Sequence, residues 1–102
     1  MNISNDYYQT GDVLYFKIDK KPTGFKKIVG NLIHKGQDHE HTIQGSFELL
    51  VNKEGQMIID VKRKSVLKHQ EHKDVAIPKG LYLKRIVLEK DHFLEEVREV
   101  ID

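Results

Sequence analysis

Two short histidine clusters are the residues of this chain best suited to chemistry. The first is His39-Glu40-His41, and the second contains His69, Glu71 and His72. Imidazole nitrogens and carboxylate oxygens are ordinary ligands of divalent transition metals. The two clusters together therefore predict one metal site. Its predicted ligands are His39, His41, His69, His72 and Glu71.

The ligand types limit which metal the site could hold. The chain has no cysteine, which excludes thiolate ligands and disulfides. Imidazoles with a carboxylate suit zinc, iron, nickel or manganese better than an iron–sulfur cluster. The site is catalytic if the metal keeps one position open for water, and structural if protein ligands fill every position. The reaction and substrate stay open, and so does the question of whether the chain is an enzyme.

The predicted site depends on the backbone that carries it. In an extended strand, residues two apart point to the same face, so His39 and His41 would lie side by side. His69 and His72 are three residues apart, and they converge only if a turn follows His69. Glu71 is placed to bind the metal or to orient an imidazole through a hydrogen bond.

The same histidines also have a purely structural interpretation. Imidazoles at loop–strand junctions can bond to carboxylates and fix loop geometry without metal. The chain is then a non-enzymatic binding or assembly module, and an exposed strand edge or the C-terminal segment makes a homo-oligomer. His34 and His92 lie outside the two clusters, and we interpret them as ordinary polar residues.

Other chemistry is poorly supported. The serines stand in no Gly-x-Ser-x-Gly context, and no glycine-rich phosphate loop follows a strand. The 17 basic and 16 acidic residues give a net charge of +1, which favours neither nucleic acid nor an anionic membrane as a partner. No apolar run is long enough to span a membrane, and no signal segment opens the chain. We expect a soluble cytoplasmic protein, whose small-molecule ligand is unknown.

Short apolar segments rich in β-forming residues recur along the chain and predict a mainly β fold. The strongest prediction is a hairpin of residues 47–51 and 57–61, joined by a turn at 52–55. Residues 26–29 and 32–33 indicate a short hairpin or one bent strand, and Gly45 indicates a bulge. The other predicted strands are residues 13–18, 42–43, 65–69 and 81–88.

The length of 102 residues predicts a single domain, a small barrel or sandwich of roughly six to eight strands. Residues 1–10 are polar, and we expect a loosely ordered arm whose Tyr7-Tyr8 pair folds back on the body. Residues 11–102 form the β domain. Apolar residues at positions 93, 94, 97, 100 and 101 predict a short C-terminal helix that opens near Asp91, with a final strand as the alternative.

Four segments follow one another in a distinctive order. They are Gly-Asp-Val-Leu at 11–14, Gly36 before His-Glu-His at 39–41, His-Gln-Glu-His at 69–72, and Ile-Pro-Lys-Gly-Leu-Tyr at 77–82. In this order they resemble a family of short uncharacterised bacterial and phage proteins. The resemblance covers most of the chain from Gly11 onward. It implies no activity, but it draws attention to the histidine clusters, and a phage context favours the assembly module.

A weaker likeness is to cupins, which are small metal-binding β-barrels. Cupins place His-x-His after a glycine and another histidine beyond a Pro-x-Gly turn, and residues 74–80 look like that second segment. Here Gly36 is closer to His39 than in cupins, and Leu83 stands where the second motif has histidine. The likeness implies a cupin-like fold at best, with His69 and His72 replacing the missing ligand.

Overall fold

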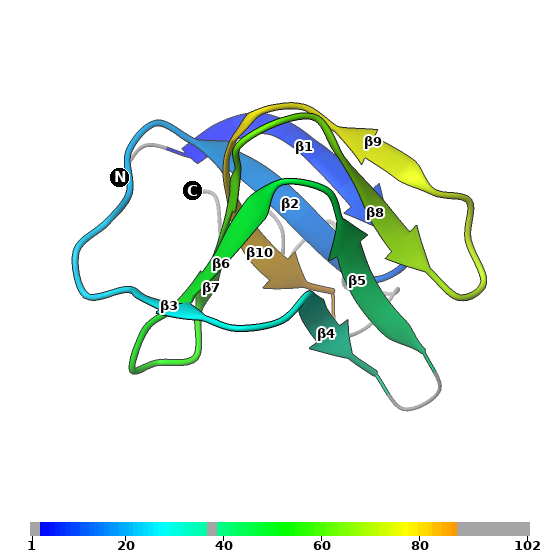
Figure 1. Ribbon diagram of the computed structural model, residues 1–102, viewed down its shortest axis with the longest axis horizontal. Coiled ribbons are helices and arrows are strands. Elements are labelled where there is room, and N and C mark those ends of the chain that lie inside the picture. The colour runs from blue at the N-terminus through cyan, green and yellow to red at the C-terminus, as the bar shows by residue number, and fades with distance from the viewer. Residues whose placement is uncertain (1–2, 37–38, 88–102) are drawn as a thin grey trace.

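The computed structural model describes residues 3–36 and 39–87, and these form a sandwich of two antiparallel sheets (Figure 1). The predicted mainly β class and the sandwich are confirmed. Within the described ranges there is no helix, and hence none that could cross a membrane. The strands are β1 (Ile3–Thr10), β2 (Val13–Ile18), β3 (Lys26–Ile28), β4 (Leu32–Lys35), β5 (Glu40–Gln44), β6 (Phe47–Val51), β7 (Met57–Val61), β8 (Ser65–His69), β9 (Val75–Ile77) and β10 (Gly80–Ile86).

The large sheet has six strands in the order β1-β2-β10-β7-β6-β3, and the small sheet has four in the order β4-β5-β8-β9. The chain passes between the sheets four times, so the strands of each sheet come from distant parts of the sequence. The predicted hairpin is confirmed as β6 and β7, with Phe47 opposite Val61 and Val51 opposite Met57. β1 also lies beside β8 and β9 and brings the two sheets together on one side (Figure 1).

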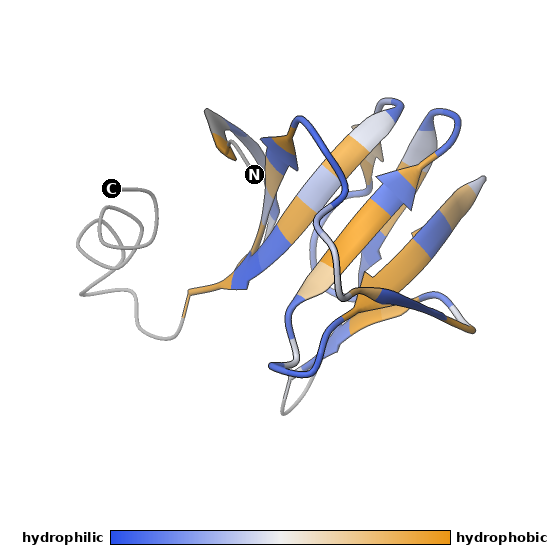
Figure 2. Ribbon diagram, turned by 90° about the vertical axis from the view of Figure 1, so that its left-hand side faces the viewer, coloured by the Kyte–Doolittle hydropathy of each residue, from blue (hydrophilic) through white to orange (hydrophobic). Residues whose placement is uncertain are grey.

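The core lies between the sheets because side chains alternate along each strand. Figure 2 shows this alternation as hydrophobic and hydrophilic bands along the ribbons. Val13 and Tyr15 of β2 pack against Ile43 of β5 and Leu67 of β8, all fully buried. Every residue of β7 is buried, since this strand is central in its sheet and covered on both faces.

The N-terminal residues differ from the expected loosely ordered arm. Ile3–Thr10 is strand β1, which pairs with β2 at Ile3 and, after a shift in register, from Tyr7 to Thr10. Tyr7 lies against Phe16 with ring centroids 5.2 Å apart, and Tyr8 lies edge-on to Tyr82 at 5.9 Å. The tyrosines do fold back on the body, as expected. The strand is hard to detect in the sequence because a sheet edge tolerates polar residues that would disfavour an internal strand.

Two local predictions are wrong for a common reason. β3 pairs with β6 in the large sheet and β4 with β5 in the small one, so residues 26–35 form neither a hairpin nor one bent strand. Gly45, with φ +138°, lies where the chain leaves β5 for β6 in the other sheet, and it is not a bulge within one strand. A Cβ at Gly45 would overlap Ser65. Both turns are crossings between sheets, which local sequence does not distinguish from hairpins.

The predicted C-terminal helix and His92 lie outside the described residues.

Candidate histidine site

Three histidines form a row across the small sheet. His34 of β4 stands opposite His41 of β5, and His41 stands opposite His69 of β8. Directly opposed residues of antiparallel strands point to the same face. The ring centroids of His34 and His41 are 5.8 Å apart, and those of His41 and His69 are 4.3 Å apart. The register of the sheet therefore brings together residues that are 35 positions apart in the chain.

The loops at the end of the same sheet add two more histidines. His39 directly precedes β5, and its ring lies 5.4 Å from that of His69. His72 follows a bend after β8, and its ring lies 4.5 Å from that of His69. The turn that the predicted site requires is therefore present. Glu71 of that bend places Oε2 3.4 Å from His39 Nε2.

The cluster has a buried part and an exposed part. His41 is 1% exposed and His69 is 9% exposed. The side chain of His39 is 36% exposed and that of Glu71 is 62% exposed, and His72 is also exposed. We call His41 and His69 the inner pair, and His39, Glu71 and His72 the rim. This division decides which side chains can reach a ligand from solvent.

The turn between β1 and β2 covers the inner pair. A Cβ at Gly11 would lie 3.2 Å from His41 Cε1 and 3.2 Å from His69 Nε2, so the two rings press against this backbone. Gly11 also has φ +57°, in the left-handed region that favours glycine. Position 11 therefore needs glycine both for its backbone and for its close approach to the rings.

A chain of hydrogen bonds passes through His41. Its Nε2 lies 3.2 Å from Asp12 Oδ1, and its Nδ1 lies 3.1 Å from Thr10 Oγ1. Since a carboxylate can only accept, Nε2 carries the proton and Nδ1 of the neutral ring accepts from the Thr10 hydroxyl. The Tyr15 hydroxyl, 3.3 Å from Thr10 Oγ1, then donates to that oxygen. Both nitrogens of His41 are thus used within the protein.

Burial determines which groups of this hydrogen-bonded row are charged. It lowers the pKa of His41 to about 4, helped by the neighbouring His69 and opposed by Asp12, so the ring is neutral at neutral pH. Burial also raises the pKa of Tyr15 to about 12. A hydroxyl, an imidazole and a carboxylate in series are the parts of a hydrolytic triad. Thr10 is only 2% exposed, however, so a substrate could not reach its hydroxyl.

His69 is also held by the protein. The backbone N–H of Glu71 donates to its Nδ1 at 3.1 Å, so a neutral ring carries its proton on Nε2, which faces Gly11. Burial lowers the pKa of His69, and its neighbours His72 and His39 lower it further. Neither nitrogen of His69 offers a free lone pair in this arrangement. Both inner histidines therefore take part in the protein's own hydrogen-bond network.

These bonds bear directly on the predicted metal site. In the described ranges, no three His, Cys, Asp or Glu side chains are arranged to hold a metal ion. The fold brings all five predicted ligands into one cluster, but both nitrogens of His41 and Nδ1 of His69 are bonded to protein partners. A shared site for four imidazoles stays a prediction, and it would require those hydrogen bonds to break.

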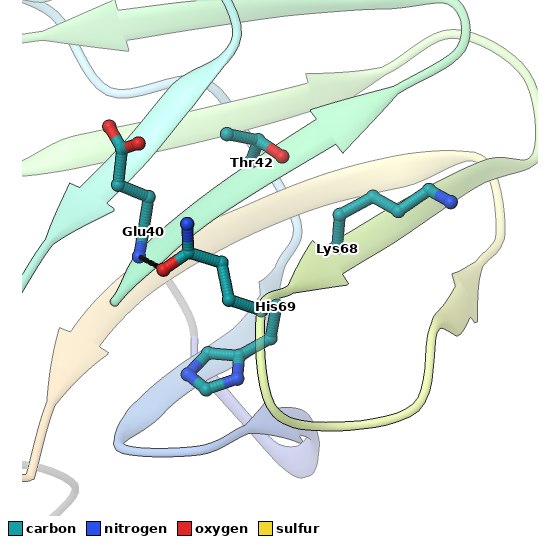
Figure 3. A pocket seen from close by; sticks show the side chains of 5 residues that line it. Glu40, Thr42, Lys68 and His69 are labelled. Carbon is teal, nitrogen blue, oxygen red and sulfur yellow. Dashed lines mark hydrogen bonds between the residues drawn. The ribbon is translucent and has the colours of Figure 1, made fainter. Parts of the chain in front are cut away.

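A shallow hollow of about 210 Å³ lies on the opposite face of the small sheet, lined by Glu40, Thr42, Lys68, His69 and Gln70 (Figure 3). The ring of His69 points away from Thr42 and Lys68, as expected for a neighbouring residue on a strand. Two of the polar side chains that line the hollow already have partners. Lys68 Nζ bonds to Asp74 at 2.8 Å, and Gln70 Oε1 accepts from the backbone N–H of Glu40 at 3.3 Å. Its size is below the roughly 300 Å³ at which small-molecule sites begin.

Sequence reasoning missed several members of this site. His34 appeared to be an isolated polar residue, and its place beside His41 depends on the register of β4 and β5. Thr10 was assigned to a loose arm, although it is buried next to His41. Gly11 and Asp12 were noted only as part of a resemblance. Their contact with the histidines could be found only after β1 was recognised as a strand.

Comparison with known proteins gives a family but no activity. Residues 9–87 match a domain of unknown function, DUF8820, which agrees with the expected uncharacterised family. The expected motifs and the bacterial or phage origin stay predictions. No curated protein and no solved structure matches the chain, so the likeness to cupins also stays untested.

Proposed function

Because the chain belongs to the DUF8820 family, a domain of unknown function, we propose a function from its own residues: it is a small domain that binds a divalent transition metal. The rim residues His39, Glu71 and His72 are the proposed ligands. Zinc, iron, nickel and manganese are the candidate ions. His41 and His69 support the rim from below and keep their hydrogen bonds.

The position and exposure of the rim support this assignment. The rings of His39 and His72 flank that of His69, with centroids 5.4 and 4.5 Å from it, and Glu71 already contacts His39. These three side chains are exposed or partly exposed and come from loops, so they can rotate to meet an ion. Coordination requires ligand atoms about 2.0–2.2 Å from zinc, which the present rotamers do not provide. Water or a small molecule would complete the coordination of an ion on such an open rim.

Calorimetric titration of the untagged protein with Zn²⁺, Ni²⁺, Co²⁺ and Mn²⁺ tests the proposal. We expect one ion per chain, with affinity lowered about tenfold or more by His39→Ala or His72→Ala, as expected for the loss of one ligand. His34→Ala is the matched control, since His34 belongs to the histidine row but not to the rim. Its affinity should equal that of the wild type.

The result also has to exclude nonspecific binding to surface histidines. A metal that binds the folded protein and not the unfolded chain raises the melting temperature, and tighter binding raises it further. Thermal unfolding with and without ion is therefore an independent readout. Absence of binding with all four ions would refute the proposal. Equal loss in His34→Ala and His72→Ala would refute the assignment to the rim.

A second candidate function is supported by a different surface. Val29 is fully exposed and Leu32 is 41% exposed, on the segment that crosses from β3 to β4. β4 is an edge of the small sheet, and unpaired strand edges with apolar residues favour association. The alternative is therefore an assembly module that forms a homo-oligomer through β4.

Light scattering coupled to gel filtration tests this alternative. We expect a dimer or larger species that Leu32→Asp converts to monomer, because a charge would have to be buried in the contact. Lys26→Gln, at an exposed position of the neighbouring β3, changes the net charge by the same amount and is the control. A wild-type monomer at every accessible concentration would exclude the assembly.

A further inference from the structure

The large sheet has a second apolar face, which points away from the small sheet. Val13 and Tyr15 point into the core, so the intervening residues of β2 point outward. The outward residues form two clusters, none of them more than 8% exposed. They are Leu14, Phe16, Ile18, Leu50, Ile58 and Leu83. We call this set the outer face.

The residues of this face are buried, although no second sheet or helix of the described residues lies over them. The side chains that pack against it include Ile3 and Tyr7 of edge strand β1, Phe25 of a loop, Leu81 of β10 and Val87. None of them belongs to a strand or helix that lies over the sheet. A sheet face with this many buried apolar residues is ordinarily packed against a second layer.

The chain itself leads onto this face after β10. Val87 is 9% exposed, packs with Leu14 and Phe16, and donates its backbone N–H to Asp12 O at 2.8 Å. The sequence then continues for 15 residues, 88–102. This segment therefore starts beside the outer face.

The length and pattern of this segment fit the face. A helix of residues 91–101 would be about 16 Å long at 1.5 Å per residue. Strands lie about 4.8 Å apart, so such a helix would cross about three of them. Its apolar residues would lie on one side. They are Phe93, Leu94, Val97, Val100 and Ile101.

Opposite net charges of the segment and of the rest of the chain add a separate reason. Residues 88–102 contain six acidic and two basic residues, a net charge of −4, and the other 87 residues carry the remaining 15 basic and ten acidic residues, a net charge of +5. Arg85 of β10 stands opposite Leu14 on the outer face. Its Nε is buried and has no hydrogen-bond partner among the described residues. A buried guanidinium nitrogen without an acceptor is costly, and a nearby carboxylate would satisfy it.

We propose that residues 88–102 form an amphipathic helix that docks on the outer face of the large sheet of the same chain. The apolar side of the helix covers Leu14, Phe16 and Leu83, and an acidic residue of the segment accepts from Arg85. This interface is independent of the histidine site, and the sandwich becomes a three-layered domain.

Single cysteines test the docking, since the natural chain has none. Val97→Cys places a thiol on the apolar side, and Glu99→Cys is the matched control on the polar side. In a docked helix, we expect iodoacetamide to alkylate Cys at position 97 about tenfold more slowly than at position 99, or slower still. Residues two apart share one face in a strand and face apart in a helix, so the same pair also distinguishes the two conformations. Urea midpoints near that of the wild type show that both variants are folded.

Two outcomes would overturn the proposal. Equal alkylation rates at 97 and 99 in the folded variants mean that the segment is not a helix docked by its apolar side. Protection that appears only at high protein concentration means that the segment covers the outer face of a second copy instead. Protection that is independent of concentration is the expected result.

Discussion

Two polar clusters among the described residues are stabilised in opposite ways. The histidine cluster on the small sheet is built around the buried and neutral inner pair. A second cluster lies on β6 and β7 of the large sheet, where Asp60 stands opposite Glu48. Lys21 and Lys62 lie 2.9 and 2.7 Å from Asp60, and Lys27 lies 3.0 Å from Glu48. We call this second set the carboxylate cluster.

The difference shows how a polar group can be kept at low exposure. Burial alone would raise the pKa of Asp60, but hydrogen bonds from Lys62 and Lys21 outweigh it and lower that pKa. Asp60 therefore stays charged because the half-exposed side chains of Lys21 and Lys62 reach it from the solvent and donate hydrogen bonds to it. For His41, burial is the largest influence, and it removes the charge. The histidine cluster is therefore stabilised by packing and by hydrogen bonds of uncharged imidazoles, and the carboxylate cluster by ion pairs.

Removing His41 should have the largest effect on stability. His41→Ala leaves a cavity under Gly11 and removes the partner of the buried Thr10 hydroxyl. Cavity formation and a lost buried hydrogen bond together predict a decrease in unfolding free energy of about 3–5 kcal/mol. Urea denaturation measures it. The control His39→Ala, on the rim, should change stability by less than about 0.5 kcal/mol. Similar losses in the two variants would mean that the division into inner pair and rim is wrong.

Lowering the pH should distinguish the two clusters, because each loses its contribution to the unfolding free energy in a different pH range. The pKa of His41 is about 4 in the folded protein and 6.5 in the unfolded chain. Between these values the unfolded chain binds a proton that the folded protein does not, so stability falls as the pH decreases through this window. The full loss is about 3 kcal/mol. His69, whose pKa is also lowered, adds a loss of the same sign.

The carboxylate cluster should respond at lower pH. Because the folded pKa of Asp60 is lowered from 3.8, its contribution is present above that pH and is lost as the pH falls below it. Unfolding free energies measured by urea denaturation from neutral pH downward should therefore fall in two stages. The upper stage should be weaker in His41→Ala and unchanged in Asp60→Asn. An upper stage of full size in His41→Ala would contradict the assignment.

A smaller effect is expected from the turn that covers the inner pair. Gly11→Ala introduces a Cβ at positive φ and forces it to within 3.2 Å of both inner histidines. Gly55→Ala is the matched control, since Gly55 has φ +80° and nothing within 4 Å. Backbone strain should cost each variant about 1 kcal/mol, with about 1 kcal/mol more at Gly11 from the crowded rings. Equal urea midpoints for the two variants would show that the turn at Gly11 can shift away from the histidine rings without a loss of stability.

Local pattern was enough to predict some of these features, and long-range pairing determined the others. Alternation and turn residues predicted the β6–β7 hairpin and the β8 strand, since both depend on neighbours in sequence. β1 pairs with the next strand in sequence, β2, and it was missed because an edge strand tolerates polar residues. The histidine clusters were found from residue type alone. The roles of His41 and His69 were not, because their hydrogen-bond partners Thr10, Asp12 and the Glu71 N–H depend on the folded backbone.

The smallest effect should come from the carboxylate cluster. Asp60→Asn keeps the size of the side chain and removes the charge that Lys21 and Lys62 share. The lost attraction is partly offset because an amide is easier to bury than a carboxylate, so we expect a smaller loss of stability than in Gly11→Ala. Salt should reduce this loss, since the lysines are half exposed and screened by ions. Stability of the wild type and of Asp60→Asn in low and high salt gives the measurement. The loss in His41→Ala should not depend on salt. A loss in Asp60→Asn that is equally insensitive to salt would mean that packing stabilises both clusters.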